Sequence, residues 1–459
     1  MSASRPDGLF GALFDRGGGG TGDQAWLQAM LDTEAALARA AERAGVTGAG
    51  RGSGAAVTAI ARAELFDTAA LAAAAAGAGN PVPALVRALT DLLPADQADA
   101  AGAIHAGATS QDIIDTAAML VARRSLGSTL ADLAAAADAC ARLARQHAGT
   151  VMSGRTLLQQ AVPVTFGLVA AGWLTAIDEV RADLSRIAAT RLAVQFGGAA
   201  GTLASLGDAG PAVAALLAGE LGLAAPVLPW HTDRQRIIQL AAGLAGACAA
   251  LGKIGRDITL LAQTEVGEVR EGGAGGGSSA MPHKQNPVAS VVVLGCAKQA
   301  PGLLATLTAA AEQEHQRAAG GWHAEWLPLS DLLALTGSAA AWSAGLLAGL
   351  RPDPDRMRAN LDASTGLPLA ENVTSLLSPA LGRLPAHDLV TRAARRATEQ
   401  GTGLADALLL DNQATELLAS AGVGRPELEA ALDPGRYLGS SEQFVRAALA
   451  AHATTEADQ

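Results

Sequence analysis

Residues 233–268 restrict the fold of this chain more than any other stretch, because they contain no proline and repeat an apolar residue at helical spacing. The repeat runs through Ile237, Leu240, Leu244, Leu251, Ile254, Ile258 and Leu261. Such spacing keeps an apolar stripe on one side of an α-helix and is typical of helices that pack lengthwise in bundles. With a rise of about 1.5 Å per residue, this helix would be on the order of 50 Å long. The stripe therefore predicts a chain built around long helices.

The composition also favours helices over sheets. Half of the 459 residues are hydrophobic, yet only 3% are aromatic, and the chain has a single tyrosine. Alanine and leucine supply most of the apolar mass and are strong helix formers, whereas aromatic residues are enriched in strands. We expect an all-α fold in three domains: an N-terminal helical domain over 1–109, a central long-helix bundle over 110–365 and a C-terminal helical cap over 366–459.

Two local signals indicate where long helices of the central bundle begin. Thr109 or Ser110 can cap a helix, and Asp112 lies where an acidic residue suits the first turn. Pro163 suits the first turn of a further helix, predicted over 163–192. Helices of this length exceed what one subunit needs to bury, so we expect them to pack between subunits as well.

Charge and cysteine content disfavour several classes of protein. The net charge is −11 and no run of Lys or Arg occurs, so a nucleic-acid partner is not expected. The three cysteines predict neither a disulfide framework nor a metal knuckle, and no His/Asp/Glu set has metal-ligand spacing. Charged or small polar residues interrupt the apolar stretches before about 20 residues accumulate, and the N-terminus lacks a signal-peptide pattern. We expect a cytoplasmic protein with no metal, organic cofactor or membrane partner.

Residues 271–287, EGGAGGGSSAMPHKQNP, are the most unusual segment. Ordering so many glycines costs much conformational entropy, and a flexible linker is one interpretation. A linker, however, has no need for the polar residues that follow the glycines. Ser278, Lys284 and Asn286 could offer a proton-transfer hydroxyl, a cation and an amide donor to a carbanion beside a carboxylate. The residue order of a phosphate-binding loop is absent.

The end of this segment resembles a family signature. GSSAMPHKQNP, over 277–287, is similar to the GSSxMPxKxNP motif of the fumarase/aspartase superfamily. Two further blocks resemble that family in the same chain order, HAGATSQD over 105–112 and GRTLLQQAVP over 154–163. The resemblance implies a homotetramer with a twenty-helix core, active sites shared between subunits, a small polycarboxylate substrate and no cofactor.

The resemblance also implies roles for single residues. Ser278 matches the loop serine that moves a Cα proton, Lys284 and Asn286 match residues that hold the substrate carboxylate and its enolate-like form, and His105 completes the catalytic candidates. Substrate contacts are implied for Thr109, Ser110, Gln111, Arg155, Gln159, Gln160, Ser279, Met281, His315, Arg317 and His323. Arg155 could instead pair with a neighbouring acid. Structural roles are expected for His147, His231, His387 and His452.

One departure from the family pattern bears on the reaction. Many members carry a histidine in the second block, at positions where this chain has Leu157 and Gln160. A neutral amide cannot act as a general acid or base near pH 7. A cycloisomerase is less affected than a lyase, because the substrate's own carboxylate closes the ring and no separate leaving group needs a proton.

Three shorter motifs favour the cycloisomerase branch: PWHT over 229–232, EHQR over 314–317 and WHAEW over 322–326. The resemblance thus predicts conversion of 3-carboxy-cis,cis-muconate to 4-carboxymuconolactone in protocatechuate breakdown, the β-ketoadipate pathway. One alternative is a lyase that eliminates fumarate, such as adenylosuccinate lyase. The other is a catalytically silent homotetramer of the same fold, which would have no physical need for Ser278, Lys284 and Asn286.

Overall fold

The computed structural model describes residues 9–17, 20–272, 281 and 283–457. The chain divides into two compact units. The first comprises Met1–Ala135, Glu179–Gly255 and Ala289–Gly345, and the second comprises Ala136–Asp178, Arg256–Val288 and Leu346–Gln459. The predicted site residues Ser278 and Ser279 lie outside the described residues.

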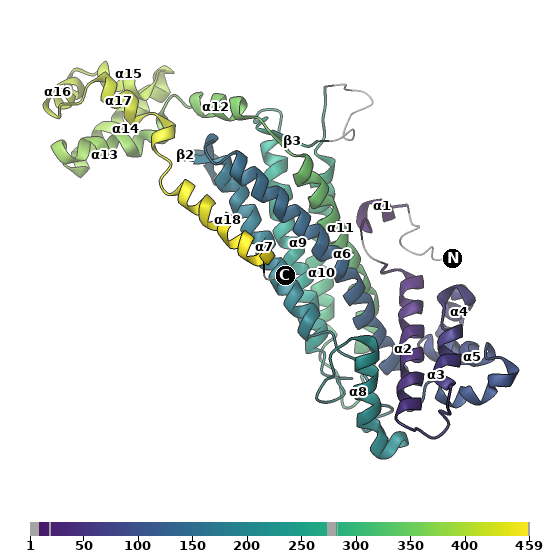
Figure 1. The fold of residues 1–459 in the computed structure, drawn as a ribbon. Coiled ribbons are helices and arrows are strands. Elements are labelled where there is room, and N and C mark those ends of the chain that lie inside the picture. Colours follow the sequence, from purple (N-terminus) through teal and green to yellow (C-terminus); the bar gives the residue numbers. More distant parts are fainter. Residues whose placement is uncertain (1–8, 18–19, 273–280, 282, 458–459) are drawn as a thin grey trace. The chain divides into compact units, whose positions relative to one another are not determined.

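Long helices dominate the described chain, as the sequence predicts (Figure 1). They are α6 (Ser110–Gln146), α7 (Phe166–Thr190), α9 (Gln235–Leu261), α10 (Val288–Ala309) and α11 (Gly321–Gly349). Every residue of the predicted stripe on α9, from Ile237 to Leu261, is at most 7% exposed. The apolar spacing therefore identified the buried side of α9 correctly.

Three of these helices are more apolar than the sequence analysis allowed for. By length and composition alone, α9, α10 and α11 are each apolar enough to cross a membrane. Burial distinguishes them: 50% of the most apolar window of α9 and 67% of that of α11 lie inside the protein, but only 28% of that of α10. Helix α10 therefore carries much apolar surface that the described residues do not cover.

Shorter helices complete the first unit. Helix α2 (Asp23–Arg43) buries Leu27, Leu31 and Leu37 together with the charged Glu34. It packs against α3, α8 and the 3₁₀ segment η3. The elements beside it are α1 (Gly11–Phe14), α3 (Ser53–Ile60), η2 (Ala63–Leu65), α4 (Thr68–Ala78), α5 (Val82–Asp91), η3 (Ala95–Ala103), η4 (Ala204–Ala209) and α8 (Gly210–Leu221).

A β-hairpin in the second unit departs from the all-α prediction. Strands β1 (Val151–Thr156) and β2 (Gln159–Thr165) pair antiparallel, and α7 begins only at Phe166. Pro163, predicted to open the helix, instead lies in β2 opposite Ser153. Proline is tolerated there because both strands of a two-stranded sheet are edge strands. A second small sheet pairs β3 (Val269–Arg270) with β4 (Arg351–Pro352), so the described chain is mostly rather than wholly helical.

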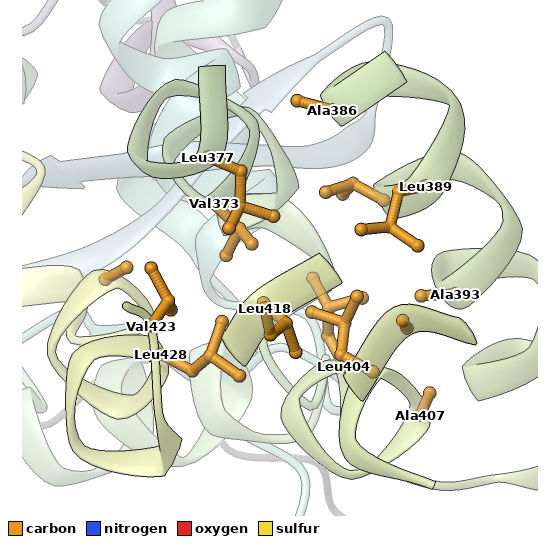
Figure 2. Packing of buried hydrophobic residues seen from close by; sticks show 14 of the residues in the cluster. Val373, Leu377, Ala386, Leu389, Ala393, Leu404, Ala407, Leu418, Val423 and Leu428 are labelled. Carbon is orange, nitrogen blue, oxygen red and sulfur yellow. The ribbon is translucent and has the colours of Figure 1, made fainter. Parts of the chain in front are cut away.

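The C-terminal helices of the second unit enclose a core of their own. Figure 2 shows Val373, Leu377, Leu389, Leu404 and Leu418 converging between them, each at most 1% exposed. The helices that supply this core are α13 (Ala370–Leu381), α14 (Arg383–Gln400), α15 (Leu404–Leu409), α16 (Asn412–Ser420) and α17 (Arg425–Ala431), with η5 (Leu367–Leu369) packed against it. The other elements of this part of the chain are α12 (Pro354–Asp362), η6 (Pro434–Arg436) and α18 (Ser441–Ala457). That residues 366–459 form a domain separate from the central bundle stays a prediction.

Candidate active site

The first block forms the start of α6. The backbone N–H of Thr109 donates to Asp112 Oδ2 at 3.0 Å, and the N–H of Asp112 donates to Thr109 O at 2.9 Å. The acidic residue in the first turn thus bonds back to the residue before the helix, which is half of a capping box. This is the helix start that the sequence predicts. It leaves Thr109 and Ser110 at the positive end of the helix dipole.

Asp112 holds this helix start against two other segments. Its Oδ1 accepts from the Gly197 N–H at 3.0 Å, its Oδ2 accepts from the Gly198 N–H at 2.8 Å, and His231 Nε2 lies 2.7 Å from Oδ1. Asp112 and His231 are both buried. His231 therefore ties the first block in place, in agreement with the structural role expected for it.

A buried ion-pair cluster lies one turn further along α6. Arg234 donates to Asp115 at 2.8 and 3.0 Å and to Glu325 of α11 at 2.6 to 3.1 Å, and all three side chains are at most 3% exposed. Burial raises the pKa of Glu325 although Arg234 opposes the rise, and the charge of Asp115 adds to it. Trp322 Nε1 donates to Asp115 Oδ1 at 3.0 Å. Arg234, Asp115 and Glu325 thus form a buried ion-pair cluster that supports the first block.

Gln111, predicted to contact substrate, makes its hydrogen bonds inside the protein, next to the ion-pair cluster. It is 1% exposed, and its Nε2 donates to Asp115 Oδ2 at 3.1 Å and to the His231 carbonyl at 2.8 Å. In this arrangement the amide positions the helix start. Its substrate contact stays a prediction.

Arg317 is the predicted residue that the structure brings directly to the first block. Its Nη1 donates to Thr109 Oγ1 at 2.8 Å. His315 lies on the same segment, where its carbonyl accepts from Thr232 Oγ1 at 3.0 Å and its side chain is exposed. The exposed ring of His323 packs against Trp322 and Trp326 at centroid distances of 5.1 and 4.8 Å.

His105 is held by a residue that the sequence analysis did not single out. Its Nδ1 lies 2.7 Å from Glu34 Oε1, and its backbone N–H donates to Glu34 Oε2 at 2.9 Å. Burial alone would lower the pKa of His105, but the hydrogen bond and charge of Glu34, together with the charge of Asp112, outweigh it and raise the pKa. His105 is therefore a cation over a wider pH range than a free histidine.

The second block lies in the second unit, on the hairpin. Arg155 donates to both oxygens of the fully buried Glu268 at 2.8 and 2.7 Å. Asn360 Nδ2 donates to Glu268 Oε1 at 2.9 Å, and Gln160 Nε2 donates to the Asn360 carbonyl at 3.2 Å. The pairing of Arg155 with a neighbouring acid, the alternative to a substrate contact, is therefore present in the structure.

The tip of the hairpin is strained and apolar. Leu157 and Leu158 form the two-residue turn, both have positive φ (52° and 65°), and Leu157 is 96% exposed. Turns of this kind favour Asn and Gly, so two leucines there cost conformational energy. Gln159 is also exposed. At the two positions where many superfamily members place a histidine, the hairpin thus has the apolar Leu157 and the neutral amide Gln160.

The remaining described candidates, Met281, Lys284 and Asn286, belong to the second unit. Met281 and Lys284 are exposed and Asn286 is half-buried. The Lys284 N–H donates to the Met281 carbonyl at 3.0 Å, and the Val288 N–H donates to the Asn286 carbonyl at 2.9 Å, directly before α10. The predicted residues therefore fall into two groups: those around the start of α6 in the first unit, and those on the hairpin and residues 281–286 in the second.

The sequence analysis missed the acids that hold these groups. Glu34, Asp115, Glu268 and Glu325 are all buried and paired with Arg or His. A signal was present for Asp115, because a charged residue inside an apolar helical stretch is rarely buried without a partner. The partner itself is distant in sequence and left no local pattern. Among the described residues, no group of three or more His, Cys, Asp or Glu could hold a metal ion.

The Glu268 contacts lead to a stability prediction. Replacing Glu268 with glutamine is expected to lower the free energy of unfolding by about 1–3 kcal/mol, because Arg155 loses its charged partner while remaining partly exposed to water. Chemical denaturation followed by circular dichroism measures this. The control is Glu442→Gln, which breaks an exposed pair with Arg446 and should cost less than about 0.5 kcal/mol. Equal losses in the two variants would contradict the prediction.

The fold and the site define a helical protein that gathers cations and hydrogen-bond donors at a helix start, which suits an anionic ligand. The family model described as "Lyase" matches residues 18–302, and the model described as "Adenylosuccinate lyase C-terminus" matches residues 366–448. The chain therefore belongs to the lyase family of the fumarase/aspartase superfamily.

Individual relatives cover nearly the whole chain. A 3-carboxy-cis,cis-muconate cycloisomerase from Pseudomonas aeruginosa is 48% identical over 94% of this chain and 93% of its own. A nitrosuccinate lyase from Streptomyces davaonensis is 45% identical over 93% of this chain and 90% of its own. The crystal structure of 3-carboxy-cis,cis-muconate lactonizing enzyme from Pseudomonas putida matches with a TM-score of 0.89 and 42% identity, covering 98% of this chain and 99% of that one.

Proposed function

We propose that this protein is a cycloisomerase that converts 3-carboxy-cis,cis-muconate to 4-carboxymuconolactone. The observation that carries the proposal is similarity at 44–48% identity to several enzymes of that name. The hairpin supports it, because Leu157 and Gln160 provide no general acid or base for a leaving group. The donors around the start of α6, with Arg317 and His105, suit a substrate that carries three carboxylates.

The proposed reaction balances without a cofactor. One substrate carboxylate oxygen forms a C–O bond to the ring-closing carbon, and the π electron pair of the attacked double bond becomes a carbanion. The neighbouring carboxylate stabilises that carbanion as an enolate-like form until a proton completes the new C–H bond. A carboxylate becomes an ester, so each turnover takes one proton from water.

Nitrosuccinate elimination is the second candidate, because the relative of that name is nearly as similar as the cycloisomerases. This reaction breaks a C–H bond and a C–N bond, leaving fumarate and nitrite, and passes a proton to water. It needs a base at the carbon, and the family resemblance gives that role to Ser278, so the hairpin does not decide between the two reactions. The two candidate reactions therefore change the pH in opposite directions.

The deciding experiment offers both substrates to the purified protein in weak buffer with a pH indicator. We expect loss of the ultraviolet absorbance of 3-carboxymuconate together with alkalinisation, and no nitrite from nitrosuccinate. Acidification with release of nitrite, and no change in 3-carboxymuconate, would overturn the proposal in favour of the lyase. Adenylosuccinate as a third substrate tests the other fumarate-eliminating alternative.

We also propose that the enzyme is a cytoplasmic homotetramer whose active sites combine residues of several subunits. The weakly buried α10 supports this, since Val291 is 55% exposed on it and Val288 is 38% exposed. An apolar surface of this kind marks a protein contact, and the family resemblance implies that other copies of the chain cover it. The three cysteines are free and buried, as suits a reducing compartment.

The tetramer leads to a prediction about Val291. Light scattering at micromolar concentration is expected to give four times the mass of one chain. Val291→Glu should shift the distribution to smaller species, because assembly would bury the new carboxylate in the subunit interface. The matched control is Leu384→Glu, which changes a 73% exposed leucine on α14. A monomeric wild-type protein would contradict the prediction.

A further inference from the structure

Glu34 is a fully buried carboxylate that contacts His105 through both of its oxygens. Its Oε1 lies 2.7 Å from ring Nδ1, and its Oε2 accepts from the His105 backbone N–H at 2.9 Å. A carboxylate is rarely buried unless it is paired and hydrogen-bonded. The two contacts fix both the ring rotation of His105 and the nitrogen that carries the proton toward Glu34. Among the described residues, the other ring nitrogen, Nε2, has no hydrogen-bond partner.

His105 also has an unusual backbone conformation. Its φ is +57°, in the left-handed region that costs energy for a residue with a side chain. Such strain persists only where the surroundings enforce it, and the hydrogen bond that the His105 N–H donates to Glu34 is one such restraint. The residue lies four positions before Thr109, whose hydroxyl accepts from Arg317. His105 is thus held in a fixed orientation close to the predicted carboxylate-binding residues.

We propose that Glu34 is a positioning residue that holds His105 as the doubly protonated imidazolium, with Nδ1–H directed at Glu34, so that Nε2–H donates to a substrate carboxylate beside Thr109 and Ser110. The assignment of that carboxylate rests on the proposed function. Glu34 acts only through His105 and does not touch the substrate. The second block of this chain lacks the histidine of many family members, at Leu157 and Gln160, whereas the first block has a histidine paired with an acid.

The charged groups around His105 agree with this role. Glu34 faces it from α2 and Asp112 from α6, and both raise the pKa of His105 against the lowering effect of burial. Arg317 is the nearby cation, bonded to Thr109. Because the pKa of folded His105 is raised, the cation is complete below the ordinary value near 6.5 and is lost as pH rises through the folded value. Carboxylate binding should weaken over the same interval.

Steady-state kinetics over a pH series test the proposal. Glu34→Gln keeps the shape of the side chain but removes its charge, so kcat/KM should fall about 10- to 10²-fold, mainly through KM, as expected for one charged hydrogen bond. In this variant the fall of kcat/KM on the alkaline side of the pH profile should move to lower pH, because Glu34 no longer raises the pKa of His105. Glu34→Asp, which keeps the charge, should restore part of the loss. Glu42→Gln is the control, because Glu42 lies on the same helix and binds the N–H groups of Gly52 and Gly54 instead.

A double mutant separates positioning from general support of the fold. If Glu34 acts through His105, Glu34→Gln should cost nothing further in a His105→Gln background. Additive losses, or a wild-type pH profile in Glu34→Gln, overturn the proposal.

A second measurement needs no substrate and so stays decisive if the cycloisomerase assignment fails. Deuterium exchange at the imidazole C2 carbon, read by peptide mass spectrometry, reports the titration midpoint of His105. The midpoint should be lower in Glu34→Gln than in the wild type and unchanged in Glu42→Gln. If Glu34→Gln does not fold, Glu34→Asp should lower the midpoint by a smaller amount. An unchanged midpoint in the folded Glu34 variant overturns the proposal.

Discussion

Replacing Arg234 with methionine is expected to lower the free energy of unfolding by about 3–5 kcal/mol, the usual cost of removing one partner from a buried ion pair. Arg234 donates to Asp115 and to Glu325, and all three side chains are almost fully buried. Methionine fills similar space but leaves two carboxylates without a cation. Denaturant unfolding followed by circular dichroism provides the measurement.

An arginine in an exposed pair gives the matched control. Arg446 bonds Glu442 at 2.8 Å, the same length as the bond from Arg234 to Asp115, but both side chains are mostly in water. Arg446→Met should therefore cost less than about 0.5 kcal/mol. If the two variants lose similar amounts, burial is not what makes the Arg234 contacts important.

The Arg234 variant should also depend on pH in a defined direction. The pKa of Glu325 is already raised by burial, and the loss of Arg234 removes the opposing charge. A carboxyl group with a raised folded-state pKa contributes stability at low pH that is lost as pH rises through that value. The difference between wild type and Arg234→Met should therefore be smaller at pH 5 than at pH 8. A difference that grows on acidification would contradict the role given to Glu325.

What the sequence predicted correctly depends on short-range patterns. The stripe on α9 and the start of α6 at Ser110 follow from spacing within one or two helical turns, and the structure has both. The β1–β2 hairpin was missed because Pro163 also suits a helix start, and only the pairing across the turn decides between the two. That pairing has no helical period and is spread over both strands.

The supporting acids were missed for a different physical reason. Glu34 and His105 are 71 residues apart in the chain, and Arg234 and Asp115 are 119 apart. Contacts of this kind arise when helices from separate parts of the sequence pack together, and no local periodicity records them. The family blocks identified residues around the start of α6 and on the hairpin, whereas the residues that fix their orientation became visible only in the folded chain.

The largest effect on turnover is expected from Ser278, which lies outside the described residues and takes its role from the family resemblance. Ser278→Ala should lower kcat at least about 10²-fold with the fold intact, in line with the contribution of a general acid. A serine hydroxyl is a weak acid in water, so this role requires a dry and positively charged pocket, for which Lys284 is the neighbouring cation in sequence. Ser420→Ala, on the exposed end of α16, is the control for removing a hydroxyl.

Gln160 gives the contrasting case of a residue expected to position rather than react. Its Nε2 donates to the Asn360 carbonyl, and the exposed side chain can still hydrogen-bond a substrate carboxylate through the same amide. Gln160→Ala should therefore weaken binding by about 1–3 kcal/mol, seen as a higher KM with kcat nearly unchanged. Near wild-type turnover in Ser278→Ala would contradict the proton-transfer role. Strong fumarate-releasing activity in Gln160→His would show that the lyase machinery was otherwise complete, and that the cycloisomerase assignment depended on this one position.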